Sequence, residues 1–239
     1  MIRKHLELIV DSIMLALFFV LFFIGGYALL DAKIIDDGAG VDEEISSLSP
    51  QFDGKDFDFS ELKKINPEII GWIRIDNTNI DYPITQTSDN SKYLVRNYRN
   101  EYSTAGAVFV DSRNDQFLDD FTVVYGHRMD GSKMFGEVSK YSEKTFFDDH
   151  LTGTLYTEDG TYSLDVINYA VLNIGITSVY RLDANKNFHN QEILQEISAS
   201  SKQQNTTITE SDKLLMLSTC DKDSQKYRDV LLLSMSKNQ

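Results

Sequence analysis

The chain has 239 residues, 41% of them apolar and 11% aromatic, which is enough for the core of one domain of ordinary size with additional segments. Its formal net charge of −14 argues against a nucleic-acid partner, because the binding of phosphates requires clustered Lys and Arg. A single cysteine excludes an internal disulfide, so packing must supply the stability of the domain.

An uninterrupted apolar segment lies near the N-terminus. Residues 12–30 carry no charge, and as a helix they span roughly 28 Å, close to the hydrocarbon thickness of a bilayer. Arg3 and Lys4 precede this segment and Asp31 follows it. We therefore expect residues 1–31 to be a cytoplasmic N-terminus and a single transmembrane anchor, with the rest of the chain outside the cell. The alternative is a cleaved signal peptide, but its apolar region would be about 7–15 residues long, and no A-x-A cleavage site follows.

An acidic segment follows the anchor. Residues 32–57 are rich in Asp and Glu, with glycines and a proline interspersed, a composition typical of a solvated tether. The remaining residues, 58–239, are predicted to form the extracellular domain.

This domain is predicted to begin with a short helix and to continue mainly as β-strands. Asp58-Phe59-Ser60-Glu61 resembles a capping box, and Pro67 would end the helix that it opens. The strand candidates, separated by turn signals such as Asp76-Asn77-Thr78-Asn79, are residues 69–75, 80–84, 107–110, 122–125, 152–156, 162–176, 214–219 and 229–236. About eight short strands predict a closed or nearly closed β-barrel.

Two helical segments are expected to interrupt the strands. Residues 134–141 form a short amphipathic piece, and residues 190–202 place Ile193, Leu194 and Ile197 on one helical face between two late strands. The expected fold class is therefore mainly β, with an N-terminal helix and an extra helix between two late strands.

The single cysteine, Cys220, is a candidate nucleophile. It ends an apolar strand and meets a polar loop, so its thiol should be reachable from solvent. At a pKa near 8.5 only about 3% of such a thiol is ionised at pH 7, and a nucleophilic cysteine therefore needs activation. The alternative, common for a lone cysteine, is a small buried apolar side chain.

His127 and Arg228 are the candidate partners of this cysteine. His127 follows the strand that ends at Tyr125 and could exchange protons, although a histidine fixed in a turn is the simpler alternative. Arg228 opens the last strand, which should pair with the strand of Cys220 and bring both residues to the same rim of the barrel. A guanidinium there would donate hydrogen bonds to a carbonyl or an oxyanion, whereas most single arginines are surface residues. Four histidines, one cysteine and no paired ligand spacing predict no metal site, and no cofactor motif is present.

These motifs resemble those of the sortases. Leu217-Ser218-Thr219-Cys220 with Arg228 is similar to the sortase L-x-T-C…R signature, and Tyr125-Gly126-His127 is similar to its histidine motif. Further segments, similar to class B sortases in particular, are residues 66–73, 79–84, 89–94 and 131–135, together with the helix predicted at 190–202.

The resemblance implies an eight-stranded sortase barrel and a cysteine transpeptidase of a Gram-positive bacterium that acts on surface proteins. Cys220 would attack the Thr carbonyl of a C-terminal sorting signal and form a thioacyl intermediate. His127 would protonate the leaving amine and later deprotonate the incoming one, and Arg228 would hold the carbonyl or oxyanion. The positions that match the substrate groove of the family are Asn90, Leu94, Ser218, Thr177 and Tyr180.

The resemblance leaves substrate and acceptor open. Class B sortases generally prefer signals of the NPxTN kind, while some members polymerise pilins, so the acceptor would be a cell-wall peptide or a pilin lysine. Arg128 follows His127 where many relatives have asparagine, and this added cation is expected to alter local electrostatics or substrate preference. An ion pair and a neutral pair of Cys220 and His127 are equally compatible with the motifs. Two other functions remain: a non-catalytic membrane-tethered binding module, and a hydrolytic cysteine protease.

Overall fold

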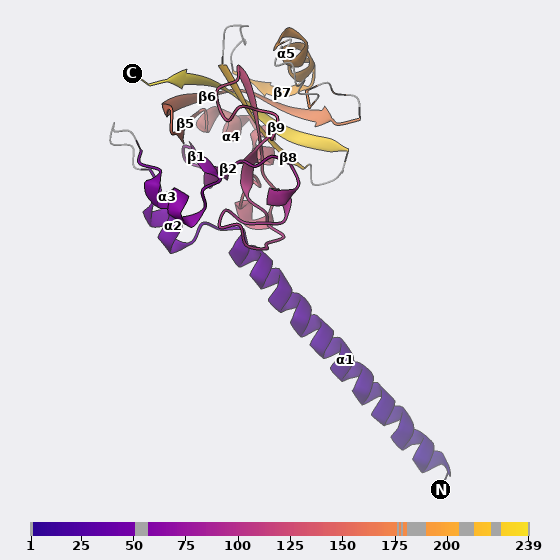
Figure 1. Ribbon diagram of the computed structural model, residues 1–239. Coiled ribbons are helices and arrows are strands. Elements are labelled where there is room, and N and C mark those ends of the chain that lie inside the picture. The colour runs from indigo at the N-terminus through magenta and orange to yellow at the C-terminus, as the bar shows by residue number, and fades with distance from the viewer. Residues whose placement is uncertain are drawn as a thin grey trace. The chain divides into compact units, whose positions relative to one another are not determined.

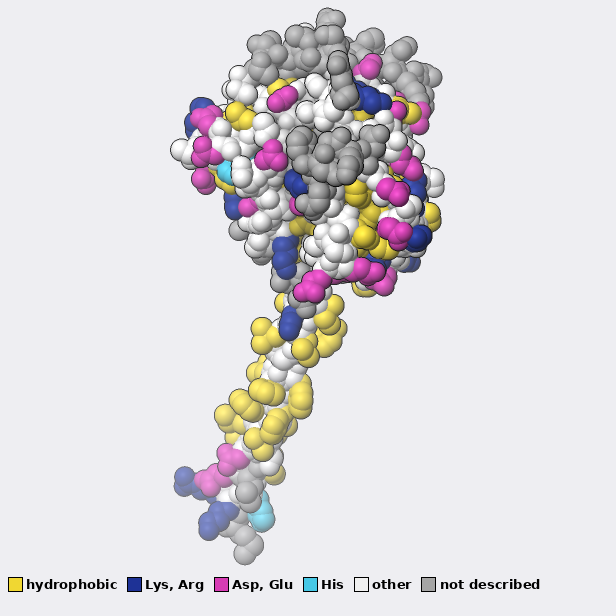
Figure 2. Space-filling view, turned by 90° about the vertical axis from the view of Figure 1, so that its left-hand side faces the viewer, with side chains coloured by type: hydrophobic (Ala, Val, Ile, Leu, Met, Phe, Trp, Pro, Cys, Tyr) yellow, Lys and Arg dark blue, Asp and Glu magenta, His cyan; other side chains and the backbone are white. Residues whose placement is uncertain are grey.

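The computed structural model describes residues 2–50, 57–175, 177, 179–180, 190–205, 213–220 and 226–238. By its contacts the chain divides into two compact units, Met1–Gly38 and Ala39–Gln239. The first unit is the helix α1 (Ile2–Gly38), which extends beyond the predicted span at both ends. Its segment Arg3–Ile35 is long and apolar enough to cross a membrane. Figure 2 shows apolar side chains covering the middle of this helix and charged side chains gathered at its N-terminal end.

The second unit is a closed β-barrel, as predicted. Within the described residues, nine strands form one sheet in the order β5-β1-β2-β3-β4-β8-β9-β6-β7, and pairing of β5 with β6 closes the first eight into a barrel (Figure 1). The strands are β1 (Ile69–Ile75), β2 (Asp81–Thr85), β3 (Val108–Val110), β4 (Phe121–Tyr125), β5 (Thr152–Thr157), β6 (Gly160–Asn173), β7 (Ser201–Gln204), β8 (Lys213–Cys220) and β9 (Tyr227–Lys237).

Most neighbouring strands in the barrel run antiparallel, but β2 and β3 run parallel, and so do β4 and β8. The register of β4 and β8 places Tyr125 opposite Ser218, so the C-terminal ends of both strands reach the same rim. The neighbouring pair β8 and β9 is antiparallel, and Cys220 at the end of β8 lies opposite Arg228 near the start of β9. The topology therefore brings the end of β4, the end of β8 and the start of β9 to one edge of the barrel, although β4 lies far from the other two in the sequence.

The strand β8 is buried on both of its faces. Leu215 and Leu217 belong to the core inside the barrel, whereas Leu214 and Met216 belong to a second apolar cluster outside it. This explains why its sequence is a continuous apolar run rather than an alternating one. Helix α5 (Asn190–Ala199) supplies the predicted Ile193, Leu194 and Ile197 to the outer cluster, and it lies beside β6 and β7 in Figure 1.

Several local expectations differ from the structure. Helix α5 ends at Ala199, and residues predicted to continue it form β7 instead, which pairs with β6. The capping box is wrong, because Asp58 accepts hydrogen bonds from Ser60 and the N-cap residue of helix α3 (Ser60–Ile65) makes no side-chain hydrogen bond. The helix predicted at 134–141 is confirmed only in its second half, where a short 3-10 helix follows turns. The short helices are α2 (Glu43–Ser47), α3 (Ser60–Ile65), α4 (Lys144–Asp149), η1 (Lys92–Leu94), η2 (Asp130–Ser132) and η3 (Val138–Ser142).

The segment Ala39–Pro50 also differs from the expected solvated tether. It belongs to the barrel unit, where Ile45 of α2 is fully buried among apolar side chains. Asp42 caps α2 through the Ile45 amide and forms an ion pair with Arg99. Acidic residues of this segment therefore bind groups of the same chain. Composition alone does not distinguish such a segment from a solvated linker. The division into residues 1–31, 32–57 and 58–239 otherwise stays a prediction.

Candidate active site

His127, Cys220 and Arg228 come to one rim of the barrel. His127 lies two residues beyond the end of β4, and Cys220 ends the neighbouring parallel strand β8. The antiparallel register of β8 and β9 then places Arg228 directly opposite Cys220. The side chain of Cys220 lies outside the described residues, so its place is defined by this backbone register.

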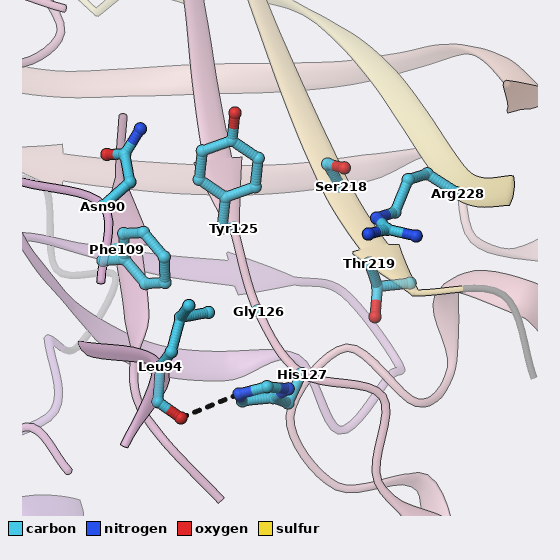
Figure 3. A pocket seen from close by; sticks show the side chains of 9 residues that line it. All are labelled: Asn90, Leu94, Phe109, Tyr125, Gly126, His127, Ser218, Thr219 and Arg228. Atoms are coloured by element: carbon cyan, nitrogen blue, oxygen red, sulfur yellow. Dashed lines mark hydrogen bonds between the residues drawn. The ribbon is translucent and has the colours of Figure 1, made fainter. Parts of the chain in front are cut away.

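A pocket of about 240 Å³ opens at this rim. Its lining residues are Asn90, Leu94, Phe109, Tyr125, Gly126, His127, Ser218, Thr219 and Arg228. Figure 3 shows Asn90, Phe109 and Leu94 on one side, Thr219 and Arg228 on the other, and Tyr125 between them. Five of the predicted site residues therefore line one pocket.

Sequence reasoning missed four of the lining residues. Tyr125 and Gly126 precede His127 in the same motif, and Thr219 precedes Cys220, so position in the motifs could have identified them. Phe109 carries no such signal. Two predicted groove residues do not line the pocket: Thr177 is buried, and Tyr180 contacts Ser218 through a hydroxyl–hydroxyl hydrogen bond of 2.7 Å.

The imidazole of His127 is oriented by a backbone carbonyl. Its Nε2 lies 2.9 Å from the carbonyl oxygen of Leu94, which is drawn as a dashed line in Figure 3. A carbonyl only accepts, so Nε2 carries the hydrogen and Nδ1 is the nitrogen that can exchange a proton. Gly106 (φ 65°) permits this close approach, because a Cβ there would lie 2.8 Å from His127 Cδ2 and 2.6 Å from the Tyr93 oxygen.

The segment that carries Leu94 is itself held by a buried tyrosine. The hydroxyl of Tyr93 donates to Glu68 and accepts from Asn66, and its carbonyl accepts from the Ala107 amide. Burial and the Glu68 carboxylate raise the pKa of Tyr93 well above its ordinary value, so the hydroxyl remains a donor. The Leu94 carbonyl is thus presented to His127 from a fixed backbone.

Arg228 and Thr219 form the opposite side of the pocket. Arg228 is half-buried and its Nη1 donates to the Tyr227 carbonyl at 2.9 Å. The hydroxyl oxygen of Thr219 is buried and has no hydrogen-bond partner in the described structure. A buried hydroxyl without a partner is costly, which makes Thr219 a candidate contact for a bound peptide.

The end of the pocket that contains Asn90, Tyr125 and Ser218 is polar. The hydroxyl of Tyr125 donates to Asp111 at 2.9 Å, and the side-chain oxygen of Asn90 accepts from the Ser112 amide at 2.7 Å. Burial, together with the Asp111 carboxylate, raises the pKa of Tyr125 far above its ordinary value. Among the described residues, no group of three or more His, Cys, Asp and Glu could hold a metal ion.

Several known proteins are similar to this chain in sequence and in fold. No family model matches the chain. Sortase B of Listeria monocytogenes is 37% identical over 177 residues, which cover 72% of this chain and 71% of that protein. A solved protein similar to sortase B from Bacillus anthracis is 32% identical, with a TM-score of 0.71 and coverage of 88% of this chain and 98% of that one. The Staphylococcus aureus sortase B–substrate complex is 29% identical, with a TM-score of 0.68 and coverage of 76% and 85%.

The closed barrel, the pocket at its rim and these likenesses define a cysteine transpeptidase of the sortase class. Since the identity to a curated relative exceeds 30% over more than two thirds of both chains, the chain belongs to the sortase B family. The resemblance expected from the motifs is thereby confirmed.

Proposed function

We propose that this enzyme cleaves a C-terminal sorting signal and transfers the new carboxyl end to an amine through a thioacyl bond on Cys220. The observation that carries the proposal is the register that brings His127, Cys220 and Arg228 to one rim beside a pocket. The neighbouring S. aureus structure is a sortase B–substrate complex, which supports a peptide substrate for this pocket.

In the first half-reaction, the Cys220 sulfur attacks the scissile carbonyl while Arg228 donates hydrogen bonds to the developing oxyanion. The proton of the Cys220 thiol passes to Nδ1 of His127. The carbon–nitrogen bond then breaks, and His127 gives this proton from Nδ1 to the leaving amine. Because Nε2 is engaged with the Leu94 carbonyl, a single ring nitrogen serves both proton transfers.

In the second half-reaction, an incoming amine attacks the thioester. His127 Nδ1 accepts the proton of this amine, a new amide bond forms, and the Cys220 sulfur leaves. A peptidoglycan peptide and a pilin lysine both supply such an amine. Polar groups of Asn90, Ser218 and Thr219 would hold the signal peptide during both steps.

The proposed location is the outer face of the cell membrane. Helix α1 would cross the bilayer once with its N-terminus in the cytoplasm, since Arg3 and Lys4 precede the apolar segment. Protease added to intact cells should then digest the barrel unit. Protection of the barrel in intact cells would contradict this orientation.

A mass-spectrometric assay tests the proposed reaction. The protein is incubated with a panel of signal peptides, including the NPxTN kind, with and without an amine. An acyl adduct on Cys220 and an amine-dependent ligation product are expected. Cys220→Ala and His127→Ala should abolish the product, whereas His150→Ala, at a histidine that hydrogen-bonds the Phe146 carbonyl, should retain it.

Each contrary result has a distinct meaning. Release of peptide at the same rate and into the same product with or without amine would identify a hydrolytic protease. No adduct with any peptide would contradict catalysis and favour a binding module. Competition between a peptidoglycan peptide and a pilin-derived lysine peptide assigns the acceptor, because the preferred amine appears in the ligated product.

A further inference from the structure

A buried carboxylate lies behind the polar end of the pocket. Asp111 directly follows β3, and its side chain is fully buried. The guanidinium of Arg113 binds it in a bidentate manner, with Nε 2.8 Å from Oδ1 and Nη2 2.7 Å from Oδ2. The Arg113 amide donates to Oδ1 and the Tyr125 hydroxyl donates to Oδ2, each at 2.9 Å. The carboxylate is thus held by donors from its own loop and from β4.

The same ion pair reaches the segment that follows β6. Arg113 uses its remaining terminal nitrogen, Nη1, to donate to the carbonyl of Tyr180 at 3.0 Å. The Tyr180 ring stacks on Tyr125, with centroids 6.3 Å apart and an interplanar angle of 24°. Its hydroxyl is hydrogen-bonded to Ser218 of β8. Tyr180 is therefore fixed at its backbone, its ring and its hydroxyl, and two of these contacts lead back to Asp111.

The ion pair of Asp111 and Arg113 is also linked through the backbone to Asn90, on the other side of the pocket. The amide of Ser112, between Asp111 and Arg113, donates to the Asn90 side chain. Gln86, just beyond β2, donates to the Asp111 carbonyl at 2.9 Å. Asn90, Tyr125 and Ser218, which form the polar end of the lining, therefore all connect to this ion pair.

We infer that Asp111 and Arg113 are positioning residues of the substrate groove. Their ion pair ties the segment of Thr177 and Tyr180 to the barrel, so that the polar end of the pocket is preorganised before a signal peptide binds. This inference rests on the proposed function. Preorganised polar groups improve binding because less ordering is required when the ligand arrives.

The geometry separates this role from that of the reacting groups. His127 is held by the Leu94 carbonyl, and Arg228 lies opposite Cys220, and neither contact involves Asp111 or Arg113. Loss of the ion pair should therefore weaken binding of the signal peptide and leave the chemistry of the bound complex intact. A merely structural ion pair would instead affect stability with KM unchanged.

The experiment uses the full chain with Arg113→Ala and Arg113→Lys. We expect Arg113→Ala to raise KM for the signal peptide about tenfold or more, with kcat within about twofold of the parent. Labelling of Cys220 by a small methanethiosulfonate, without peptide, should proceed at the parent rate. Lysine cannot form the bidentate pair and the third contact together, so Arg113→Lys should restore binding only in part.

The matched control is Arg99→Ala. Arg99 also pairs with two carboxylates, those of Asp42 and Glu44, but these lie in the segment before the barrel. The KM of Arg99→Ala for the signal peptide should equal that of the parent. An unchanged KM in Arg113→Ala, or an equal rise in Arg99→Ala, would overturn the inference.

A second measurement requires no enzymatic activity. Amide hydrogen exchange at Thr177 and Val179, measured without peptide, should be faster in Arg113→Ala than in the parent. If Arg113→Ala fails to fold, Arg113→Lys takes its place and should show the same change. The exchange rates in Arg99→Ala should equal those of the parent. Parent rates at both amides in the folded Arg113 variant would refute the positioning role. Failure of the proposed function is a separate result, because it would appear as absence of any Cys220 adduct in the parent enzyme.

Discussion

Arg128, the residue after the pocket histidine, forms an ion pair with Asp229, the residue after Arg228. Its Nη1 lies 3.1 Å from Oδ2 of Asp229, whose side chain is 4% exposed. The hydroxyl of Tyr169 donates to the other carboxylate oxygen at 2.6 Å. The cation that was expected to alter the local electrostatics is thus paired, and it links the histidine loop to β9.

Removing this link should affect both stability and catalysis. Arg128→Ala leaves a buried carboxylate with one donor fewer, and we expect a loss of about 2 kcal/mol in the free energy of unfolding. Because the link joins the neighbours of His127 and Arg228, kcat should fall as well. Urea unfolding and peptide kinetics measure the two effects. Lys63→Ala, which breaks the exposed pair with Glu158, should change neither by a comparable amount.

Gly106 should be required for the placement of His127. In Gly106→Ala the new methyl group would meet the Tyr93 carbonyl and the imidazole, so kcat should fall about tenfold or more. Gly131→Ala is the matched control, since Gly131 has a similar φ of 72° and a methyl group added there would have no atom within 4 Å. Both variants carry the backbone strain, and a comparable loss of kcat in the control would show that strain explains the effect.

Thr219 should bind the signal peptide through its hydroxyl. Thr219→Val keeps the shape of the side chain and removes a buried oxygen that has no partner in the described structure. Stability should therefore stay the same or rise by about 1 kcal/mol, while kcat/KM falls about three- to tenfold. Thermal unfolding and peptide kinetics provide the check. A destabilised variant with parent kcat/KM would show that the hydroxyl serves the fold.

The Asp111 carboxylate should contribute to the acid dependence of stability. Burial raises its pKa, but hydrogen bonds from Arg113 and Tyr125 outweigh burial and hold the pKa below its ordinary value. The contribution is fully present above the unfolded pKa of about 4 and is lost as pH falls through the lower folded pKa. Stability curves of the parent and of Asp111→Asn should hence converge below about pH 4. Parallel curves at every pH would contradict this linkage.

The segment before the barrel should stabilise the domain. Ile45 is fully buried, and Ile45→Ala should lower the free energy of unfolding by about 3 kcal/mol and Tm by roughly 6–12 °C. Leu118→Ala, at a side chain that is 58% exposed, is the control and should have little effect. Equal Tm values for both variants would favour the tether that composition suggested.

The elements that could be predicted from the sequence are those whose own residues show the apolar pattern of a buried strand or helix. The run that forms β8 is apolar because both of its faces are covered, and its motif residues locate the cysteine at its end. His127 and Arg228 were identifiable for the same reason, since each adjoins such a strand.

Other features depend on partners that are distant in sequence. The strand β7 consists of Ser201-Lys202-Gln203-Gln204, which has no apolar pattern and exists by pairing with β6. Asp111 looks like an ordinary loop residue until Arg113 and Tyr125 are seen around it. The burial of Ile45 is equally invisible, because one apolar residue in an acidic segment carries no periodicity.

The parallel pairing of β4 and β8 has a consequence for engineering this enzyme. The backbone ladder between them sets the separation of the two outgoing segments, one leading to His127 and one ending in Cys220. The connections beyond this rim can accordingly be grafted from another family member while the ladder keeps the entry points at a constant spacing. Chimaeras made in this way would vary the segments around the pocket on an unchanged scaffold.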